Sequence, residues 1–193
     1  MQAKTPIIVG ITGASGAVLA LNAVDELLAR DVPTVVVCSN SARLVWQDEL
    51  GVSFNDTLVD WQENPSFTFY PVNDMRAPIA SGTYPTRGMA IVPASMNTVA
   101  SIAHGVTHNL IHRAADVCLK ERRRLVLVPR ETPFSAIHLE HMLSLTRMGA
   151  VILPAAPGFY HQPTRIDDLI DFIVARILNQ LGIEHRLMPR WGE

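Results

Sequence analysis

The hydrophobic positions of this chain form short, nearly continuous runs that alternate with longer segments of helical periodicity. PIIVGIT at 6–12 precedes a helical pattern at 17–30, and PTVVVC at 33–38 precedes another at 42–50. Strands that are apolar at nearly every position are typical of a parallel sheet, because helices cover both of its faces. We therefore predict alternating strands and helices from the N-terminus onward.

The alternation pauses between 51 and 86, where the sequence is more polar, and we expect that stretch to be irregular. The later predicted strands are GMAIVP at 88–93, LVLVP at 125–129 and AVILP at 150–154. The later predicted helices lie near 98–104, 109–123, 135–148 and 166–181. This order predicts an α/β fold, a Rossmann-like (flavodoxin-like) doubly wound parallel sheet with helices on both faces.

We find no repeat or linker that would divide the chain, so residues 1–193 are expected to form a single domain. Within it, the tail at 182–193 contains Pro189 and Trp191 and is expected to dock on a neighbouring surface. The hydrophobic content of 48% exceeds what a small monomer needs, so part of the apolar surface is expected to face other subunits.

Charge and cysteine content narrow the class of protein. The net charge of -2 provides no broad positive field, so we predict neither nucleic-acid nor membrane binding. Cys38 and Cys118 form no C-x-x-C pair or disulfide framework, which favours a reducing, cytoplasmic location. No segment is long enough, without charges or turn residues, to span a bilayer. We therefore predict a soluble protein.

The first predicted strand ends in GITGASG at 10–16 and leads into a helix. Backbone N–H groups and the Ser15 hydroxyl are thereby placed at the positive end of a helix dipole, which predicts a phosphate site. The spacing is not G-x-G-x-x-G, and the second strand ends in Cys38-Ser39 where an acid would bind a ribose. FMN therefore fits better than NAD. The alternative is a glycine turn that only joins strand to helix.

A second polar loop follows another predicted strand. PASMNT at 93–98 places hydroxyls and an amide at the carboxyl end of the strand, the side on which ligands of open sheets bind. We expect this loop and the first to border one crevice. The alternative is that Ser95 and Asn97 only cap the helix that follows.

The segment RAADVCLKERRRLVLVPRETP at 113–133 runs from a cation-rich helix into an apolar strand. Arg113 and Lys120 are seven residues apart, nearly on one helical face, while Arg130 and Glu131 follow the strand. We expect these three cations and one acid to converge on an anion.

The C-terminal third adds two candidates. Tyr160 lies in a proline-bounded loop and is a candidate to hold a ligand oxygen. Arg176 is flanked by aliphatic residues in the last predicted helix, so we expect it to reach inward. The alternative for Arg176 is a salt bridge to Asp168 or Asp171.

Three histidines imitate a metal-binding stripe, because His104, His108 and His112 recur every four residues. Gly105 is expected to break the helix between them, and no carboxylate or cysteine set accompanies them. We therefore predict no metal site.

Together these motifs resemble one family, the flavin prenyltransferases of the UbiX/Pad type, within the homo-oligomeric flavin-containing cysteine decarboxylase-like superfamily. The resemblance covers almost the whole chain, with the motifs in the family's order and spacing. The matching segments are GITGASGA at 10–17, Ser39, SGTYPTRGMAIVPAS at 81–95, RAADVCLKERRRLVLVPRETP at 113–133 and GFYHQP at 158–163.

The resemblance implies three sets of site residues. Those matching FMN-binding positions are Gly13, Ala14, Ser15, Ser39, Ser95, Met96, Asn97, Thr98 and Arg130. Those matching positions that hold dimethylallyl monophosphate are Arg113, Lys120, Arg130, Glu131, Tyr160 and Arg176. Those matching residues that act in catalysis are Ser15, Glu49, Glu131 and Trp191.

The implied reaction is transfer of a dimethylallyl unit from the monophosphate to N5 of reduced FMN, followed by ring closure at C6. Cations and hydroxyls would stabilise the leaving phosphate, and the sequence has no acid-rich cluster for Mg²⁺, so a metal-free reaction is expected. The resemblance further implies a homododecamer and a UbiD-type decarboxylase that receives the prenylated FMN, in ubiquinone biosynthesis or aromatic acid decarboxylation.

Two alternatives stay open at the level of sequence. PASMNT also resembles the decarboxylase branch of the superfamily, since many prenyltransferases carry a basic residue where this chain has Asn97. An FMN-dependent cysteine decarboxylase is therefore one alternative. A non-catalytic flavin-binding subunit is the other.

Overall fold

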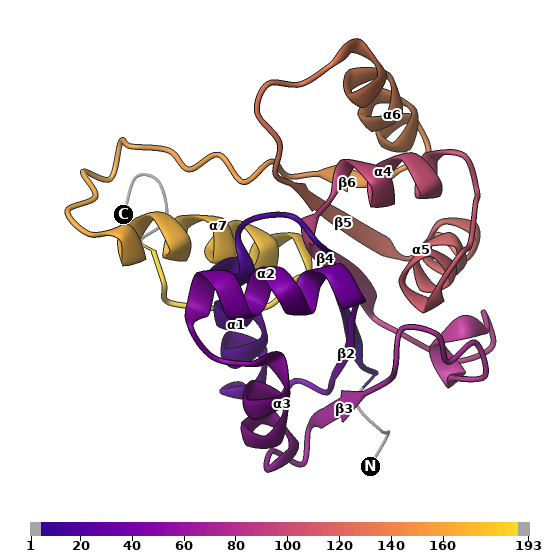
Figure 1. Cartoon of the computed structure of the whole chain (residues 1–193), viewed down its shortest axis with the longest axis horizontal. Coiled ribbons are helices and arrows are strands. Elements are labelled where there is room, and N and C mark those ends of the chain that lie inside the picture. The colour runs from indigo at the N-terminus through magenta and orange to yellow at the C-terminus, as the bar shows by residue number, and fades with distance from the viewer. Residues whose placement is uncertain (1–4, 189–193) are drawn as a thin grey trace.

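The computed structural model describes residues 5–188, which form a parallel sheet flanked by helices (Figure 1). The strands are β1 (Ile7–Ile11), β2 (Thr34–Cys38), β3 (Phe67–Phe69), β4 (Gly88–Ala94), β5 (Arg124–Pro129) and β6 (Val151–Ile152). The helices are α1 (Ala17–Leu28), α2 (Asn40–Leu50), α3 (Phe54–Gln62), η1 (Pro78–Ala80), α4 (Met96–Ala103), α5 (Leu110–Lys120), α6 (Ala136–Arg147) and α7 (Ile166–Gln180).

The six strands are parallel and lie in the order β3-β2-β1-β4-β5-β6. The chain runs outward from β1 to β3 and then returns to place β4 on the other side of β1. The strand order therefore reverses between β1 and β4, and ligands of such sheets bind outside the carboxyl ends of the strands at this switch point. The predicted doubly wound α/β fold is confirmed.

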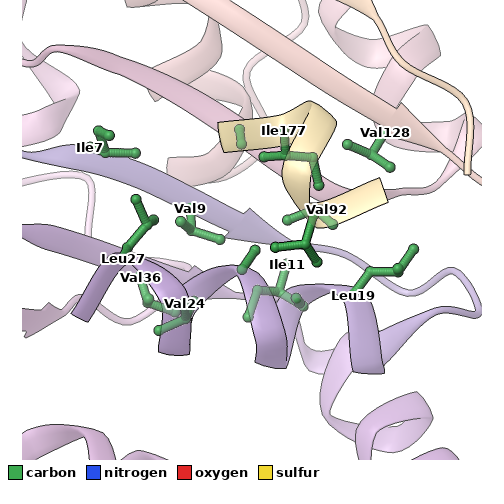
Figure 2. Packing of buried hydrophobic residues seen from close by; sticks show 14 of the residues in the cluster. Ile7, Val9, Ile11, Leu19, Val24, Leu27, Val36, Val92, Val128 and Ile177 are labelled. Atoms are coloured by element: carbon green, nitrogen blue, oxygen red, sulfur yellow. The ribbon is translucent and has the colours of Figure 1, made fainter. Parts of the chain in front are cut away.

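Each face of the sheet carries its own core, because successive side chains of a strand point to opposite faces. In β1, Ile7, Val9 and Ile11 belong to the core shared with α1 and α7, whereas Ile8 belongs to the core shared with α5. Figure 2 shows the first of these cores, with Ile7, Val9 and Ile11 packed among side chains of α1 and α7. Burial on both faces explains the continuous apolar runs of the sequence.

The expectation of an irregular stretch between 51 and 86 is wrong for its first part, which contains α3 and β3. Ser53 caps α3, and Phe54 and Trp61 bury the apolar face of this helix. Both rings meet Trp46 of α2 edge-on, with centroids 5.2 and 5.7 Å away. The outer face of α3 is mostly polar, so the composition of this segment does not indicate its short apolar face.

The histidines do not line one helix. As predicted, the helix breaks, since α4 ends at Ala103 and Gly105 has a φ of +67°. His104 instead meets His141 of α6, with their Nε2 atoms 3.0 Å apart. Within residues 5–188, no three His, Cys, Asp or Glu side chains are grouped to hold a metal ion.

The described part of the tail packs on its own chain. Ile183 is buried, and the Arg30 Nε donates to the Glu184 carbonyl at 3.0 Å. Docking of the remaining tail on a neighbouring surface stays a prediction, because 189–193 lie outside the described residues. Among the described helices, none is long and apolar enough to cross a membrane.

Candidate functional site

Two of the predicted loops are joined at the switch point between β1 and β4. The Thr12 hydroxyl, at the end of β1, donates to the Pro93 carbonyl at 2.7 Å and accepts from the Ser95 N–H at 2.8 Å. Thr12 is 3% exposed, so a buried hydroxyl fixes the GASG loop beside the PASMNT loop. This contact was not among the sequence predictions, although a threonine at the end of an apolar strand is a usable signal.

The loop after β2 contributes a pair of hydroxyls next to Gly13. The Ser39 and Ser41 hydroxyls lie 3.1 Å apart, and the Ser39 hydroxyl also accepts from the Ala42 N–H at 3.1 Å. A Cβ on Gly13 would overlap the Ser41 side chain. The absence of that Cβ lets the GASG backbone approach the two hydroxyls. Sequence reasoning selected Ser39 but missed Ser41, two residues further on.

Ser95 caps α4, as its alternative interpretation predicted. Its hydroxyl accepts from the Thr98 N–H at 3.3 Å and donates to the Thr98 Oγ1 at 3.1 Å. Met96 and Thr98 are buried, whereas Asn97 is exposed in the first turn and is not the cap. The Ser95 hydroxyl satisfies the Thr98 N–H, while the Met96 and Asn97 N–H groups before it have no intrahelical acceptor and can donate to a ligand.

Glu49 lies in the last turn of α2, and its side chain reaches the start of α1. Its carboxylate accepts hydrogen bonds from the Gly16 N–H at 2.9 Å and the Ala17 N–H at 2.8 Å. Partial burial raises the pKa of the Glu49 carboxyl, but hydrogen bonds from the Ser15 hydroxyl and the two backbone N–H groups, with the nearby Arg130 charge, outweigh it. The pKa therefore lies below its ordinary value, and the group is an anion at neutral pH.

The position of the Glu49 carboxylate contradicts the prediction that the N–H groups at the start of α1 bind a phosphate. The two N–H groups at the start of α1, which the sequence offered to a phosphate, already bind Glu49. Donors that remain for an anion at this edge include the Ser39 and Ser41 hydroxyl pair beside Gly13 and the first turn of α4.

Arg130 and Glu131 follow β5 at the same carboxyl edge. The Arg130 N–H donates to the Ala94 carbonyl at 3.4 Å, and its side chain is exposed within electrostatic reach of Glu49. Glu131 is partly buried and accepts from the Thr132 N–H at 3.1 Å. Arg130 and Ser15 thus both lie close enough to Glu49 to lower its pKa.

Arg113 and Lys120 lie elsewhere. The Arg113 Nε donates to the Ala80 carbonyl at 3.0 Å, and its Nη1 pairs with Asp116 at 2.7 Å. Lys120 ends α5 and pairs with Glu121, also at 2.7 Å. Both cations therefore have protein partners within the chain.

Lys120 lies near the amino ends of the strands, whereas Arg130 lies at their carboxyl ends. Lys120 ends the crossover helix just before β5 begins, and Arg130 follows the last residue of the strand. β5 has six residues, and at about 3.3 Å per residue its ends lie roughly 20 Å apart. Lys120 and Arg130 of the same chain therefore do not meet at one anion, and convergence of the predicted cations would need more than one chain. A crossover helix is antiparallel to the strands that it connects. Its C-terminus therefore lies near the amino ends of the strands, and the end of the next strand lies on the opposite side.

Tyr160 and Arg176 share a third location. They line a cavity of about 1210 Å³ with Arg30, which follows the last turn of α1, and Arg186. Arg176 is exposed, so the expectation that it reaches inward is wrong. Among the described ion pairs, none joins it to Asp168 or Asp171. Trp191 lies outside the described residues.

Comparison with known proteins identifies the family. The model of the Flavoprotein family matches residues 1–178. The flavin prenyltransferase UbiX of Halalkalibacterium halodurans is 49% identical over 190 residues, covering 96% of this chain and 92% of that protein. The flavin prenyltransferase UbiX of Pseudomonas aeruginosa is 47% identical and covers 100% of this chain and 97% of that protein.

Solved structures agree. AnUbiX (PadA1), crystallised in complex with FMN and dimethylallyl pyrophosphate, superimposes with a TM-score of 0.93 at 41% identity, covering 99% of each chain. A dodecameric FMN-dependent UbiX-like decarboxylase from Escherichia coli O157:H7 gives a TM-score of 0.91 at 41% identity, covering 98% of this chain and 100% of that one. With its strand-end loops in place and its relatives matched over nearly their whole length, the chain belongs to the UbiX flavin prenyltransferases of the flavoprotein family.

Proposed function

We propose that this protein transfers the dimethylallyl group of dimethylallyl monophosphate to N5 and C6 of reduced FMN, without a metal, at sites shared between subunits of a homododecamer. Its product, prenylated FMN, would serve a UbiD-type decarboxylase in the cytoplasm. Support comes from the UbiX relatives, from the FMN and dimethylallyl pyrophosphate bound by AnUbiX and from the dodecameric assembly of the Escherichia coli protein.

The carboxyl edge of the sheet has the chemistry that FMN requires. Gly13 lacks a Cβ where Ser41 packs, and the Ser39 and Ser41 hydroxyls beside it suit a phosphate oxygen. Arg130 adds a cation at the same edge. A mononucleotide needs this set of donors and no ribose-binding acid, so the residues present fit FMN.

The main support for a site shared between subunits is the separation of the substrate-binding residues on one chain. On one chain they lie in three places: Arg130 and Glu131 after β5, Arg113 and Lys120 on α5, and Tyr160 with Arg176 by the large cavity. Residues at opposite edges of a sheet cannot hold one small phosphate. Packing of several copies can bring the three groups together, and a closed homo-oligomer repeats such a contact at every site.

The exposed apolar surface supports the same conclusion. On α6, the side chains of Ile137, Leu139 and Leu143 are 61%, 54% and 51% exposed. Phe159 and Ile166, in the connection to α7 and at its start, are 68% and 76% exposed. Figure 1 shows this connection extending away from the sheet before it returns as α7. A monomer would leave these side chains in water, whereas contacts between copies would bury them.

The chemistry assigned to the side chains follows from charge. Breaking the allylic C–O bond places negative charge on the phosphate, which Lys120, Arg130 and Arg176 would stabilise in the transition state. Arg113 would support the same positive environment, and the Tyr160 hydroxyl would donate to a phosphate oxygen. The Ser15 hydroxyl, which donates to Glu49 in this structure, would have to turn from Glu49 to do the same. Reduced FMN supplies the nucleophilic N5 and C6 positions.

Two carboxylates and one indole complete the assignment. Glu49 and Glu131 are the candidates to hold or move the protons of the ring-forming step, and Glu49 is already an anion. Trp191 is the candidate to steady an allylic cation with its ring face.

The experiment is anaerobic incubation of the protein with reduced FMN and dimethylallyl monophosphate in the presence of EDTA, followed by mass spectrometry of the extracted flavin. A flavin heavier by one C5 unit is expected. Tightly bound but unmodified FMN would contradict the proposal, and a peptide with a C-terminal cysteine would then separate a cysteine decarboxylase from a non-catalytic flavoprotein.

A further inference from the structure

A loop at 80–86 is fastened to the end of α5 by the Arg123 guanidinium. Arg123 Nη2 donates to the Gly82 carbonyl at 2.6 Å. Its Nη1 donates to the Tyr84 carbonyl at 2.8 Å and to the Thr86 hydroxyl at 3.2 Å. Three acceptors of one loop therefore share a single cation, and charge-assisted bonds of this kind are stronger than neutral ones.

Arg123 differs in this from the arginines beside it in the sequence. Arg122 and Arg124 are exposed, whereas Arg123 is partly buried against the loop. The sequence alone gave no reason to separate the three, since a basic cluster at a helix end is commonly solvated. The fold assigns one of them to the loop and leaves its neighbours in water.

Gly82 is the point at which this loop meets Lys120. A Cβ on Gly82 would lie 2.8 Å from the Lys120 Nζ and would overlap the Glu121 carboxylate that pairs with it. Gly82 is outside the positive-φ region, so the need for glycine here is space and not backbone conformation. The backbone of the loop at Gly82 therefore sterically restricts the positions of the Lys120 and Glu121 side chains.

We infer that Arg123 and Gly82 are positioning residues for Lys120: Arg123 holds the 80–86 loop, and the bare backbone of Gly82 leaves the room in which the Lys120 ammonium meets the phosphate of the prenyl donor. This inference rests on the proposed function, because it gives Lys120 a phosphate to bind. Lys120 also borders a cavity of about 520 Å³ with Asp116 and Arg122, so its ammonium is accessible to a ligand.

Gly82→Ala tests the inference with the smallest change. The added methyl group meets flexible ends of side chains and not backbone, so the Lys120–Glu121 pair is expected to move while the fold is kept. We expect the KM for dimethylallyl monophosphate to rise about tenfold, as for one displaced charge-assisted hydrogen bond, with the melting temperature and FMN affinity unchanged.

Arg123→Gln is the second variant, and Arg124→Gln is its matched control, with the same charge removed from an exposed side chain. Arg123→Gln is expected to raise the same KM, and Arg124→Gln to leave it unchanged. Equal KM values in the two variants would overturn the role of Arg123. An unchanged KM in a folded Gly82→Ala protein would overturn the role of Gly82.

The Lys120→Ala background separates positioning from a general structural effect. If both residues act through Lys120, neither substitution should raise KM further once Lys120 is absent. If Gly82→Ala or Arg123→Gln raised KM by the same factor with and without Lys120, the inference would be overturned. The proposed function is tested independently, by formation of prenylated FMN in the unaltered protein. Should the unaltered protein form it while Lys120→Ala leaves KM unchanged, the inference fails and prenyl transfer stands.

Discussion

At the scale of single residues, the most instructive side chain is Glu49. It lies on α2, yet it binds the first N–H groups of α1, a contact between helices that sequence periodicity does not reveal. A negative charge at a helix start is stabilised by unpaired N–H groups and by the helix dipole. Glu49 therefore orders the GASG loop in addition to any part it takes in proton transfer.

We predict that Glu49→Gln lowers the free energy of unfolding at pH 7 by about 1 kcal/mol, the scale of a helix-terminal charge. Because the folded pKa of Glu49 is lowered, its charge stabilises fully above the unfolded pKa of about 4.3. That stabilisation disappears as the pH falls through the lower folded pKa. Chemical denaturation of both proteins across pH 3 to 7 measures this, with Asp48→Asn, an adjacent exposed acid, as the control. A difference that persists unchanged at the lowest pH would contradict the electrostatic explanation.

The serines show what residue types alone can predict. Hydroxyls after β2 and β4 are predicted from sequence because small polar residues at the carboxyl ends of parallel strands face the ligand crevice, and the structure places Ser39 and Ser95 at these strand ends. Ser41 was missed because its value depends on Gly13, 28 positions earlier in the chain. Only the fold shows which glycine and which hydroxyl meet.

At the scale of elements, α3 is the segment that composition concealed. Trp61 is 4% exposed, and its indole N–H donates to Asp25 of α1 at 2.7 Å. The helix thus packs an aromatic group against α2 and ties it to α1. An apparently polar insertion is therefore part of the hydrophobic core.

We predict that Trp61→Ala lowers the free energy of unfolding by about 4 kcal/mol, because a large buried ring is removed and a cavity remains. Trp61→Phe should cost less, since a phenyl ring keeps part of the buried aromatic volume, although the hydrogen bond to Asp25 is lost. Urea denaturation gives both values. Val59→Ala, an exposed position of the same helix, serves as the control, and an equal loss there would show that α3 does not depend on the buried ring.

At the scale of the whole molecule, the site residues are divided by the sheet. Lys120 and Arg130 lie at opposite edges, and Arg176 lines a separate cavity. These residues are too far apart to form one site within a chain. Such a separation is expected when a site is formed by residues of several subunits.

We predict that Lys120→Ala and Arg176→Ala each abolish most prenyl transfer, and that mixed oligomers of the two variants regain activity. If a site takes Lys120 and Arg176 from different chains, random mixing leaves about one quarter of the sites with both residues. The two proteins are unfolded together, refolded and assayed for prenylated FMN. Separately refolded samples that are then combined form the control. No recovery in the co-refolded sample would place both residues of a site on the same chain.

The sequence by itself determined the parallel α/β fold, the two cores and the strand-end loops that suit FMN, because buried strands, helical periodicity and glycine turns are local patterns. Its motifs also indicated the family that the relatives confirm. Only the tertiary structure decided that Glu49 occupies the start of α1, that Arg123 holds the loop at Lys120 and that the predicted cations are kept apart. These depend on distances between segments remote in sequence, and such distances are set by the direction in which each helix crosses the sheet.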